Sequence, residues 1–265
     1  MGPIQPTGTR KKYPTMIQFF QDFRTPAVLL SVFFSLVFVS ACSSDEDAIP
    51  AYVERPVEEL YNEAMDSLQA EKYRTAAPLF DEVERQHPYS KWATKAQLMS
   101  AYSYYMSNRY DDALVALDRY IQLHPSSEDV AYAHYLKALS YYEQITDITR
   151  DQKATYLAKL SLEEVIARFP GSRYAKDARI KLDLALDHLA GKEMEIGRFE
   201  LRRENYLAAI NRFKRVIELY QTTTHVPEAL HRMTEAYLAL GLEENARKAA
   251  SVLGYNMRSK VILSW

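Results

Sequence analysis

The feature that most constrains the fold is a repeat of 37 residues in which the same kinds of side chain return at the same offsets. Each copy has a small residue in a first helix, an aromatic residue at a turn, a second small residue, a large apolar residue and a closing proline. Small side chains let two helices approach closely, and the large residue fills the space beside them. One hairpin cannot bury its apolar face alone, so successive hairpins must stack. The recurring pairs are Ala64 and Ala101, Tyr73 and Tyr110, Ala76 and Ala113, Phe80 and Leu117, Val83 and Tyr120, His87 and His124, and Pro88 and Pro125.

The third copy keeps the pattern but is longer. Ala138 lies 37 residues after Ala101, whereas the closing Pro170 lies 45 residues after Pro125, which indicates an insertion of eight residues. The insertion falls in residues 144–153, between the two helices of this copy. A loop at that place can lengthen without disturbing the packing of the helices.

The fourth and fifth copies continue the array. Gly197 lies twelve residues before Ala209, the same distance that separates the two small residues in earlier copies, and Ala246 lies 37 residues after Ala209. Apolar residues on one face predict a single long helix over residues 173–204. The pattern resembles the tetratricopeptide repeat, lengthened by three residues. We therefore predict an all-α fold, an α-α superhelix of five tetratricopeptide-like helical hairpins.

Pro78 tests the start of the second helix in the first copy. If Thr75 caps that helix, the proline falls in its first turn, where the missing N–H is not needed. The sequence therefore predicts a helix that begins after Thr75.

The single cysteine, Cys42, follows an apolar run. Residues 27–41 carry no charge, follow basic residues and end in small ones, which is the layout of a secretory signal peptide. Fifteen residues are few for a membrane span, which takes about 20. Residues 39–42 resemble the lipobox of bacterial lipoproteins, so we expect cleavage before Cys42 and its lipidation. The alternative is an incidental cysteine after an ordinary cleavage site. By the lipoprotein rule, Ser43 in place of an aspartate indicates the outer membrane.

The predicted organisation has four parts. Residues 43–56 are polar, contain two prolines and lack an apolar period, which is typical of a tether. The parts are a removed lipoprotein signal peptide (1–41), the lipidated cysteine with a flexible tether (42–56), the repeat superhelix (57–255) and a carboxy-terminal tail (256–265).

Composition argues against several classes of function. The chain has 33 basic and 35 acidic residues, and loss of residues 1–41 would remove four basic residues and only one acidic residue. Nucleic-acid binding usually needs a basic face, so we do not expect it. No two of the six histidines have the spacing of a helical zinc site, and no Gly-rich phosphate loop or nucleophilic serine motif is present. We expect no metal, no cofactor and no enzymatic activity.

Tyrosines are concentrated in the first helices of the second and third copies. In a superhelix of this kind the first helices line the concave surface. Tyrosine combines apolar area with a hydrogen-bonding tip, which suits a peptide groove, although plain packing explains such a set about equally well. The candidate groove residues are Tyr102, Tyr105, Tyr132, Tyr135 and Tyr142.

Arginines are concentrated in the fourth copy of an otherwise acidic chain. A solvated helix face is the commoner explanation of such a charge run, but the cluster spans both helices of the copy, so a docking surface for an acidic partner is a competing one. The candidate docking residues are Arg198, Arg202, Arg203, Arg212 and Arg215.

The order of these features resembles the BamD family of outer-membrane assembly lipoproteins. The more specific stretches are "RFPGSRYAKDARIKLDLALDHLAGKEMEIGRF" and "NYLAAINRFKRVI", because generic repeats lack the long fourth-copy helix. The resemblance covers the chain from Cys42 to about Tyr255. Arg212 matches a family position at the contact with BamA, the barrel insertase.

The resemblance implies a non-enzymatic scaffold that is lipid-anchored on the periplasmic face of the outer membrane. Its amino-terminal repeats would receive unfolded barrel proteins, and its carboxy-terminal repeats would dock on the last POTRA domain of BamA. Accessory lipoproteins of the same machine are further candidate partners. The alternative is a periplasmic repeat lipoprotein that scaffolds cell-wall synthesis or division proteins.

Overall fold

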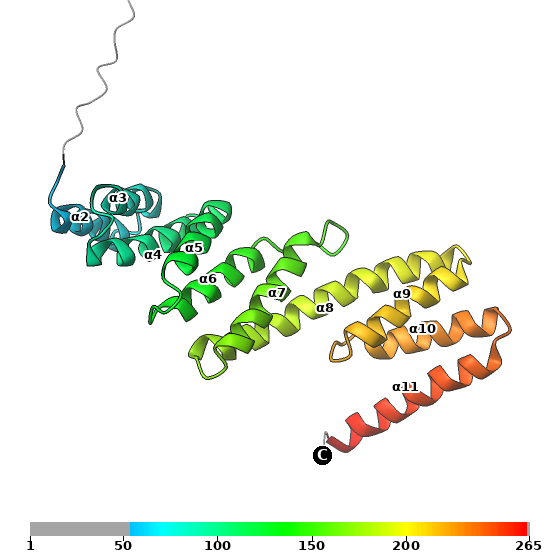
Figure 1. Cartoon of the computed structure of the whole chain (residues 1–265). Coiled ribbons are helices and arrows are strands. Elements are labelled where there is room, and N and C mark those ends of the chain that lie inside the picture. Colours follow the sequence, from blue (N-terminus) through cyan, green and yellow to red (C-terminus); the bar gives the residue numbers. More distant parts are fainter. Residues whose placement is uncertain (1–53, 264–265) are drawn as a thin grey trace, which may run out of the picture. The chain divides into compact units, whose positions relative to one another are not determined.

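The computed structural model describes residues 54–263, which form ten α-helices and no strand (Figure 1). The helices pair into five hairpins, α2–α3 to α10–α11, and the fold class predicted from the repeat is confirmed. The predicted signal peptide, Cys42 and most of the predicted tether lie outside the described residues. The helices are α2 (Val57–Gln69), α3 (Tyr73–Gln86), α4 (Lys91–Met106), α5 (Tyr110–Leu123), α6 (Val130–Tyr142), α7 (Lys153–Arg168), α8 (Arg173–Arg202), α9 (Tyr206–Leu219), α10 (Val226–Ala239) and α11 (Glu243–Leu263).

Successive hairpins pack mainly through the second helix of one and the first helix of the next. Each first helix contacts the first helix of the next hairpin, from α2 to α10, whereas within the described residues no second helix contacts another second helix. The array therefore curves with α2, α4, α6, α8 and α10 on its inner side. This places the first helices where the sequence predicts a concave surface.

The core consists of the small and large residues of the repeat. Ala64, Ala101 and Ala138 are fully buried, and so are Phe80 and Leu117. Each sits in a local cluster that joins three successive helices. Because each cluster holds only neighbouring helices together, the stability of this fold is distributed along the array.

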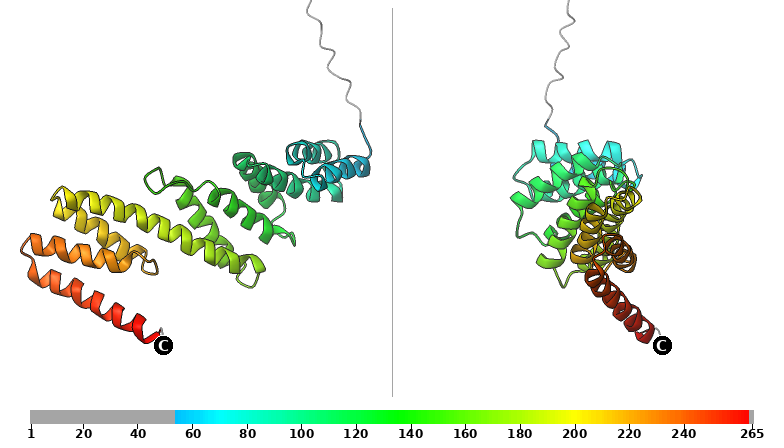
Figure 2. Two further views of the ribbon diagram at one scale, coloured as in Figure 1. Left: turned by 180° about the vertical axis from the view of Figure 1, so that it is seen from behind. Right: turned by 90° about the vertical axis from the view of Figure 1, so that its right-hand side faces the viewer.

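The long helix α8 joins the third hairpin to the fourth, as Figure 2 shows from two further sides. Ala178 in its first half packs with Leu162 of α7, and Met194 in its second half packs with Phe213 of α9. The helix has 30 residues, in agreement with the predicted range. Among residues 54–263, no helix has the length and apolar character needed to cross a membrane.

Four of the five hairpins turn in the same way. The turn residues Glu71, Asn108, Glu204 and Gly241 all have positive φ, between 56° and 72°. The following N–H bonds back to a carbonyl five residues earlier, as in Lys72 N to Ser67 O at 2.9 Å. This is the Schellman pattern, in which a left-handed residue satisfies the last carbonyls of a helix. The third hairpin has residues 143–152 in place of this turn.

The start of α3 differs from the prediction. The helix begins at Tyr73, and Thr75 is not its cap, so Pro78 is the sixth helical residue rather than part of the first turn. The tight turn at Glu71 starts the helix immediately, as the equivalent turns do for α5 and α9. Pro78 is exposed, so its ring meets solvent. Because proline has no N–H, the helix loses one hydrogen bond.

The backbone stays helical past residue 255, where the predicted repeat superhelix ends and the predicted tail begins. Helix α11 runs without interruption from Glu243 to Leu263. Residues 255–263 contain neither proline nor glycine, and Gly254 alone costs a helix only about 1 kcal/mol. Most of the predicted tail is therefore a continuation of the last repeat helix.

Candidate functional site

A row of partly exposed tyrosines crosses the inner side of the array. The rings of Tyr132 and Tyr135 on α6 lie 5.5 and 5.2 Å from the ring of Tyr174 on α8. Tyr102 and Tyr105 on α4 pack against the same core cluster as Tyr132. Tyr142 packs on the same cluster as Tyr135 and Tyr174. We call these side chains the tyrosine belt: Tyr102, Tyr105, Tyr132, Tyr135, Tyr142 and Tyr174.

Burial raises the pKa of three phenols of the belt, those of Tyr105, Tyr132 and Tyr135. Burial raises the pKa of Tyr105 to about 12, with the nearby Glu143 carboxylate as the next cause. The pKa of Tyr132 rises for the same reason, and the phenols of its neighbours add to the effect. The pKa of Tyr135 is raised by burial and by its hydrogen bond to Asp177. At neutral pH these side chains therefore offer O–H donors and apolar ring faces.

Three belt hydroxyls are free to bind another molecule. Tyr135 donates to Asp177, and Tyr105 donates to Glu143 at 3.4 Å. The hydroxyls of Tyr102, Tyr132 and Tyr142 have no hydrogen-bond partner within the described part of the chain. A partly exposed phenol without a partner can bind a passing backbone carbonyl or amide at little cost.

The predicted arginine cluster divides into two groups. Arg212 and Arg215 on α9 both contact Glu193 of α8, at 3.1 and 3.2 Å, one on each carboxylate oxygen. The Glu193 side chain is only 10% exposed, so it fixes the position of both guanidinium groups. A buried carboxylate is costly unless it is paired with cations. The guanidinium groups of Arg212 and Arg215 together supply the pairing that Glu193 needs.

The second group lies near the end of α8. Arg198 forms a two-pronged bond with Glu228 of α10, at 2.9 and 2.6 Å, and this bond raises its pKa. Arg202 lies 4.0 Å from Glu195 and is largely exposed. Arg203 lies over the ring of Phe199 at 5.4 Å. Arg198 therefore ties two hairpins together, while Arg202 and Arg203 face solvent.

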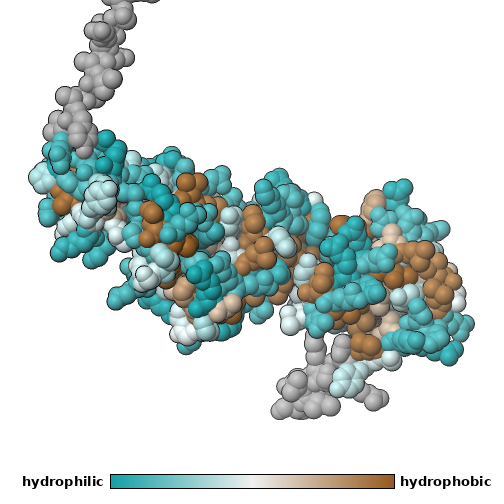
Figure 3. Space-filling view, in the orientation of Figure 1, coloured by the Kyte–Doolittle hydropathy of each residue, from teal (hydrophilic) through white to brown (hydrophobic). Residues whose placement is uncertain are grey.

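An exposed apolar surface adjoins Arg202 and Arg203. The α8–α9 and α10–α11 turns lie at the same end of the repeats in Figures 1 and 2. Large apolar residues near these turns are exposed, and Figure 3 shows apolar surface at this end. Contiguous apolar surface beside charged residues is typical of a protein-binding face. The exposed residues are Phe199, Leu207, Leu238, Leu240 and Leu242, of which Leu207 is 66% exposed.

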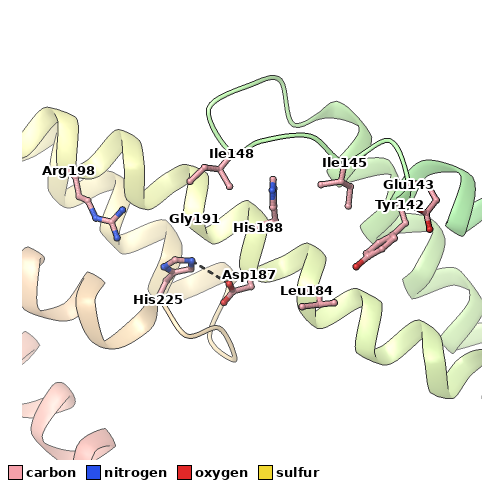
Figure 4. Close-up of a pocket in the computed structure, with 10 residues that line it drawn as sticks. All are labelled: Tyr142, Glu143, Ile145, Ile148, Leu184, Asp187, His188, Gly191, Arg198 and His225. Carbon is pink, nitrogen blue, oxygen red and sulfur yellow. Dashed lines mark ion pairs between the residues drawn. The ribbon is translucent and has the colours of Figure 1, made fainter.

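A pocket of about 510 Å³ lies beside the belt (Figure 4). One stripe of α8 forms its floor, because the α8 residues that line it recur mostly at spacings of three and four. The loop after α6 forms one wall, and His225 at the start of α10 forms the other. The lining residues are Tyr142, Glu143, Ile145, Ile148, Leu184, Asp187, His188, Gly191, Arg198 and His225.

The inserted loop of the third hairpin is fastened to α8. Gln152 receives a hydrogen bond from Thr155 and lies 3.1 Å from Nδ1 of His188, and Lys192 donates to the carbonyl of Thr149 at 2.9 Å. A β-carbon on Gly191 would lie 3.3 Å from His225 and 3.6 Å from Ile148. The absence of a side chain at Gly191 therefore lets both walls approach the floor.

Sequence reasoning missed several members of these sites. Tyr174 could have been found, because it is the second residue of a first helix, as is Trp92 in α4. The carboxylate partners Glu193 and Glu228 gave no such signal, because only the packing of helices brings them to the arginines. Among the described residues, no group of three or more potential ligands could hold a metal ion.

The stacked helical hairpins define a tetratricopeptide-like repeat protein. The family described as YfiO, outer membrane lipoprotein, matches residues 53–253, and the chain belongs to this family. The chain is 47% identical over 242 residues to the outer membrane protein assembly factor BamD of Caulobacter vibrioides, covering 91% of this chain and 79% of that protein. It is 48% identical over 218 residues to the BamD of Rickettsia prowazekii, covering 82% and 86%. A solved tetratricopeptide repeat protein from Parabacteroides merdae is 12% identical, with a TM-score of 0.37 and coverage of 75% and 79%.

Proposed function

We propose that this chain is a non-enzymatic scaffold for the assembly of outer membrane proteins. Cys42 would carry the lipid that anchors it to the periplasmic face of the outer membrane. The tyrosine belt would bind unfolded segments of barrel proteins, and the fourth and fifth hairpins would dock on the POTRA domain of a BamA-type insertase. Accessory lipoproteins would join the same assembly. The named function of the BamD relatives supports this assignment.

The tyrosine belt is the observation that carries the client-binding role. Its rings follow the inner side across three successive first helices, α4, α6 and α8. An extended segment presents alternating side chains and free backbone groups. Aromatic faces and unpartnered hydroxyls in a row can bind both, with little demand on the sequence of the segment. Binding on the scaffold would raise the concentration of the client at the insertase.

Client binding can be tested by removing hydroxyls from the belt. We expect Tyr102→Phe combined with Tyr132→Phe to weaken binding of a labelled carboxy-terminal barrel-protein peptide by about fivefold, because each loses a hydrogen bond. Tyr89→Phe is the matched control, since Tyr89 is fully exposed in the α3–α4 connection. Equal affinity of the double variant and the control would contradict this role, provided that their melting temperatures agree.

Docking depends on which arginines can meet a partner. Arg202 and Arg203 are exposed beside the apolar surface of the two turns, while Arg212 and Arg215 are held in position by Glu193. A planar guanidinium that is already fixed loses less entropy when it binds a second carboxylate. This arrangement favours an acidic partner.

The docking test should avoid a charge reversal at Arg212, because a new carboxylate would face the buried Glu193. We expect the double variant Arg202→Glu and Arg203→Glu to lose the insertase when the tagged chain is purified from membranes in mild detergent. Arg74→Glu, at an exposed position on α3, is the control. Recovery of the insertase with every variant would contradict the assigned surface. Recovery of cell-wall enzymes without the insertase would favour the alternative scaffold.

A further inference from the structure

The pocket beside the belt carries negative charge that the protein does not neutralise. Glu143 and Asp187 both line it, and within the described residues neither forms an ion pair with a lysine or an arginine. Glu143 is exposed and accepts one hydrogen bond, from Tyr105 at 3.4 Å. Asp187 accepts from the N–H and hydroxyl of Thr224 at 3.1 and 2.8 Å, and lies 3.5 Å from His225.

The cation in the lining does not cancel this charge. Arg198 is bound to Glu228 through two hydrogen bonds and lies 3.7 Å from Glu195. Two carboxylates already balance that guanidinium. The remaining carboxylates, Glu143 and Asp187, therefore set the sign of the potential in the pocket, and a partly enclosed space strengthens it.

The walls of the pocket are apolar as well as acidic. Ile145 and Ile148 come from the inserted loop, and Leu184 comes from α8 (Figure 4). Aliphatic walls that lead to carboxylates match the side chain of arginine or lysine, which has an apolar stem and a charged tip. A pocket of about 510 Å³ has room for such a side chain with the backbone that carries it.

The pocket is continuous with the tyrosine belt. Tyr142 belongs to both, and the adjacent Glu143 is joined to the belt by the hydroxyl of Tyr105. A segment bound along the belt therefore reaches the pocket at the carboxy-terminal end of α6. The chain's own tether is a poor occupant, because residues 43–53 contain three acidic residues and no basic one, and its one cation, Arg55, pairs with Glu59 and Glu63.

We infer that this pocket is a specificity site that takes a basic side chain of the client segment lying on the tyrosine belt. Glu143 and Asp187 bind the charged tip, and Ile145, Ile148 and Leu184 pack on its stem. The inference rests on the proposed client-binding function and adds to it a preference among client segments. Clients with an arginine or lysine near their aromatic residues are preferred over neutral ones.

The test compares two peptides that differ in one charge. Each is an extended, fluorescein-labelled peptide of alternating aromatic and polar residues, with a central arginine in one and the neutral isostere citrulline in the other. Binding to the full mature chain in detergent is followed by fluorescence anisotropy. We expect the arginine peptide to bind about fivefold more tightly, since a charge-assisted bond is stronger than a neutral one.

The protein variants locate the effect. Glu143→Gln and Asp187→Asn should each reduce the preference for arginine, and together they should abolish it. Glu244→Gln, on the exposed face of α11, should leave it unchanged. Asp187 also holds Thr224, so if Asp187→Asn lowers the melting temperature, Glu143→Gln decides, because Glu143 bonds to no backbone group in the described residues.

Each outcome separates the pocket from the belt. Equal binding of both peptides by the unaltered protein would overturn the inference and leave the client-binding function standing. Failure of both peptides to bind would contradict the proposed function, and the inference would fall with it. Tightest binding of a third peptide with glutamate at the central position would also overturn the inference, because it would assign the pocket to an anion through Arg198.

Discussion

A β-carbon placed on Gly197 of α8 would lie 2.5 Å from Cε1 of Phe213 on α9. No side chain fits in that distance. The glycine therefore allows the two helices of the fourth hairpin to pack closely around the buried phenylalanine. Gly197 stands where the earlier repeats have alanine. The first hairpin has Ala64 and Phe80 at the same two positions, so glycine is required here by the closer approach of Phe213 to its partner helix rather than by the aromatic ring alone.

We expect Gly197→Ala to destabilise the protein although alanine favours helices. Overpacking costs about 1–3 kcal/mol and the gain in helix propensity is about 1 kcal/mol, so the net loss should be up to about 2 kcal/mol. Thermal unfolding followed by circular dichroism should show a decrease of several degrees.

The matched control is Gly254→Ala in α11, because a β-carbon there meets nothing within 4 Å. It should raise the melting temperature slightly, as expected for a helix without a steric conflict. If both variants were stabilised, the close contact between Gly197 and Phe213 would not exist in solution.

The link between Arg198 and Glu228 should make the α8–α10 contact sensitive to acid. The two hydrogen bonds from Arg198 hold the pKa of Glu228 below its ordinary value of 4.5. A carboxylate with a lowered pKa contributes stability above its unfolded pKa, and this contribution is lost as the pH falls through the folded value. Because 37% of the side chain is exposed, solvent screening limits the contribution to about 1 kcal/mol.

We therefore expect Glu228→Gln to lower the melting temperature at neutral pH and to have a decreasing effect from about pH 5 downward. The measurement is the difference in melting temperature between the two proteins across this range. Glu244→Gln on α11 serves as the control for a general loss of negative charge. A difference that stays constant with pH would mean that the carboxylate is not stabilised by Arg198.

The repeated turns predict opposite effects of two substitutions at one position of the repeat. Glu204 has φ of 62° and Gly241 has φ of 72°, and both end the first helix of a hairpin. A left-handed conformation costs a residue with a β-carbon about 1 kcal/mol and costs glycine almost nothing. We expect Glu204→Gly to stabilise the protein by up to about 1 kcal/mol and Gly241→Ala to destabilise it by a similar amount, as measured by chemical denaturation. Changes of the same sign would show that the turn geometry differs in solution.

Much of the architecture could be predicted because the repeat fixes local geometry. Ala101 and Leu117 are buried where the spacing of the repeat places them, and the inserted residues of the third hairpin lie between its two helices. The start of α3 could not be predicted, because the tight turn before it is set by the backbone conformation of Glu71 rather than by a capping residue. The helical end of the chain was missed because a weak apolar pattern does not stop a helix.

The candidate sites could be predicted only in part. The tyrosines of α4 and α6 come together because they share the inner face of first helices, which the repeat already indicates. The arginines do not form one surface, since Arg198 turns to α10 while Arg212 and Arg215 turn to Glu193. The arginines of α8 and α9 lie close together in the sequence but point in different directions. Only the packing of the helices decides which carboxylate each arginine meets.

The sequence by itself determined the helices, their pairing and the inner face, because these follow from the period of small and large apolar residues. The tertiary structure alone decided which charges are neutralised and where a pocket remains. Within the described residues, Glu143 and Asp187 have no lysine or arginine partner, and the arginine that lines their pocket, Arg198, is already bound to Glu228. Which charged side chains pair depends on the distances between hairpins, and no local sequence pattern indicates those distances.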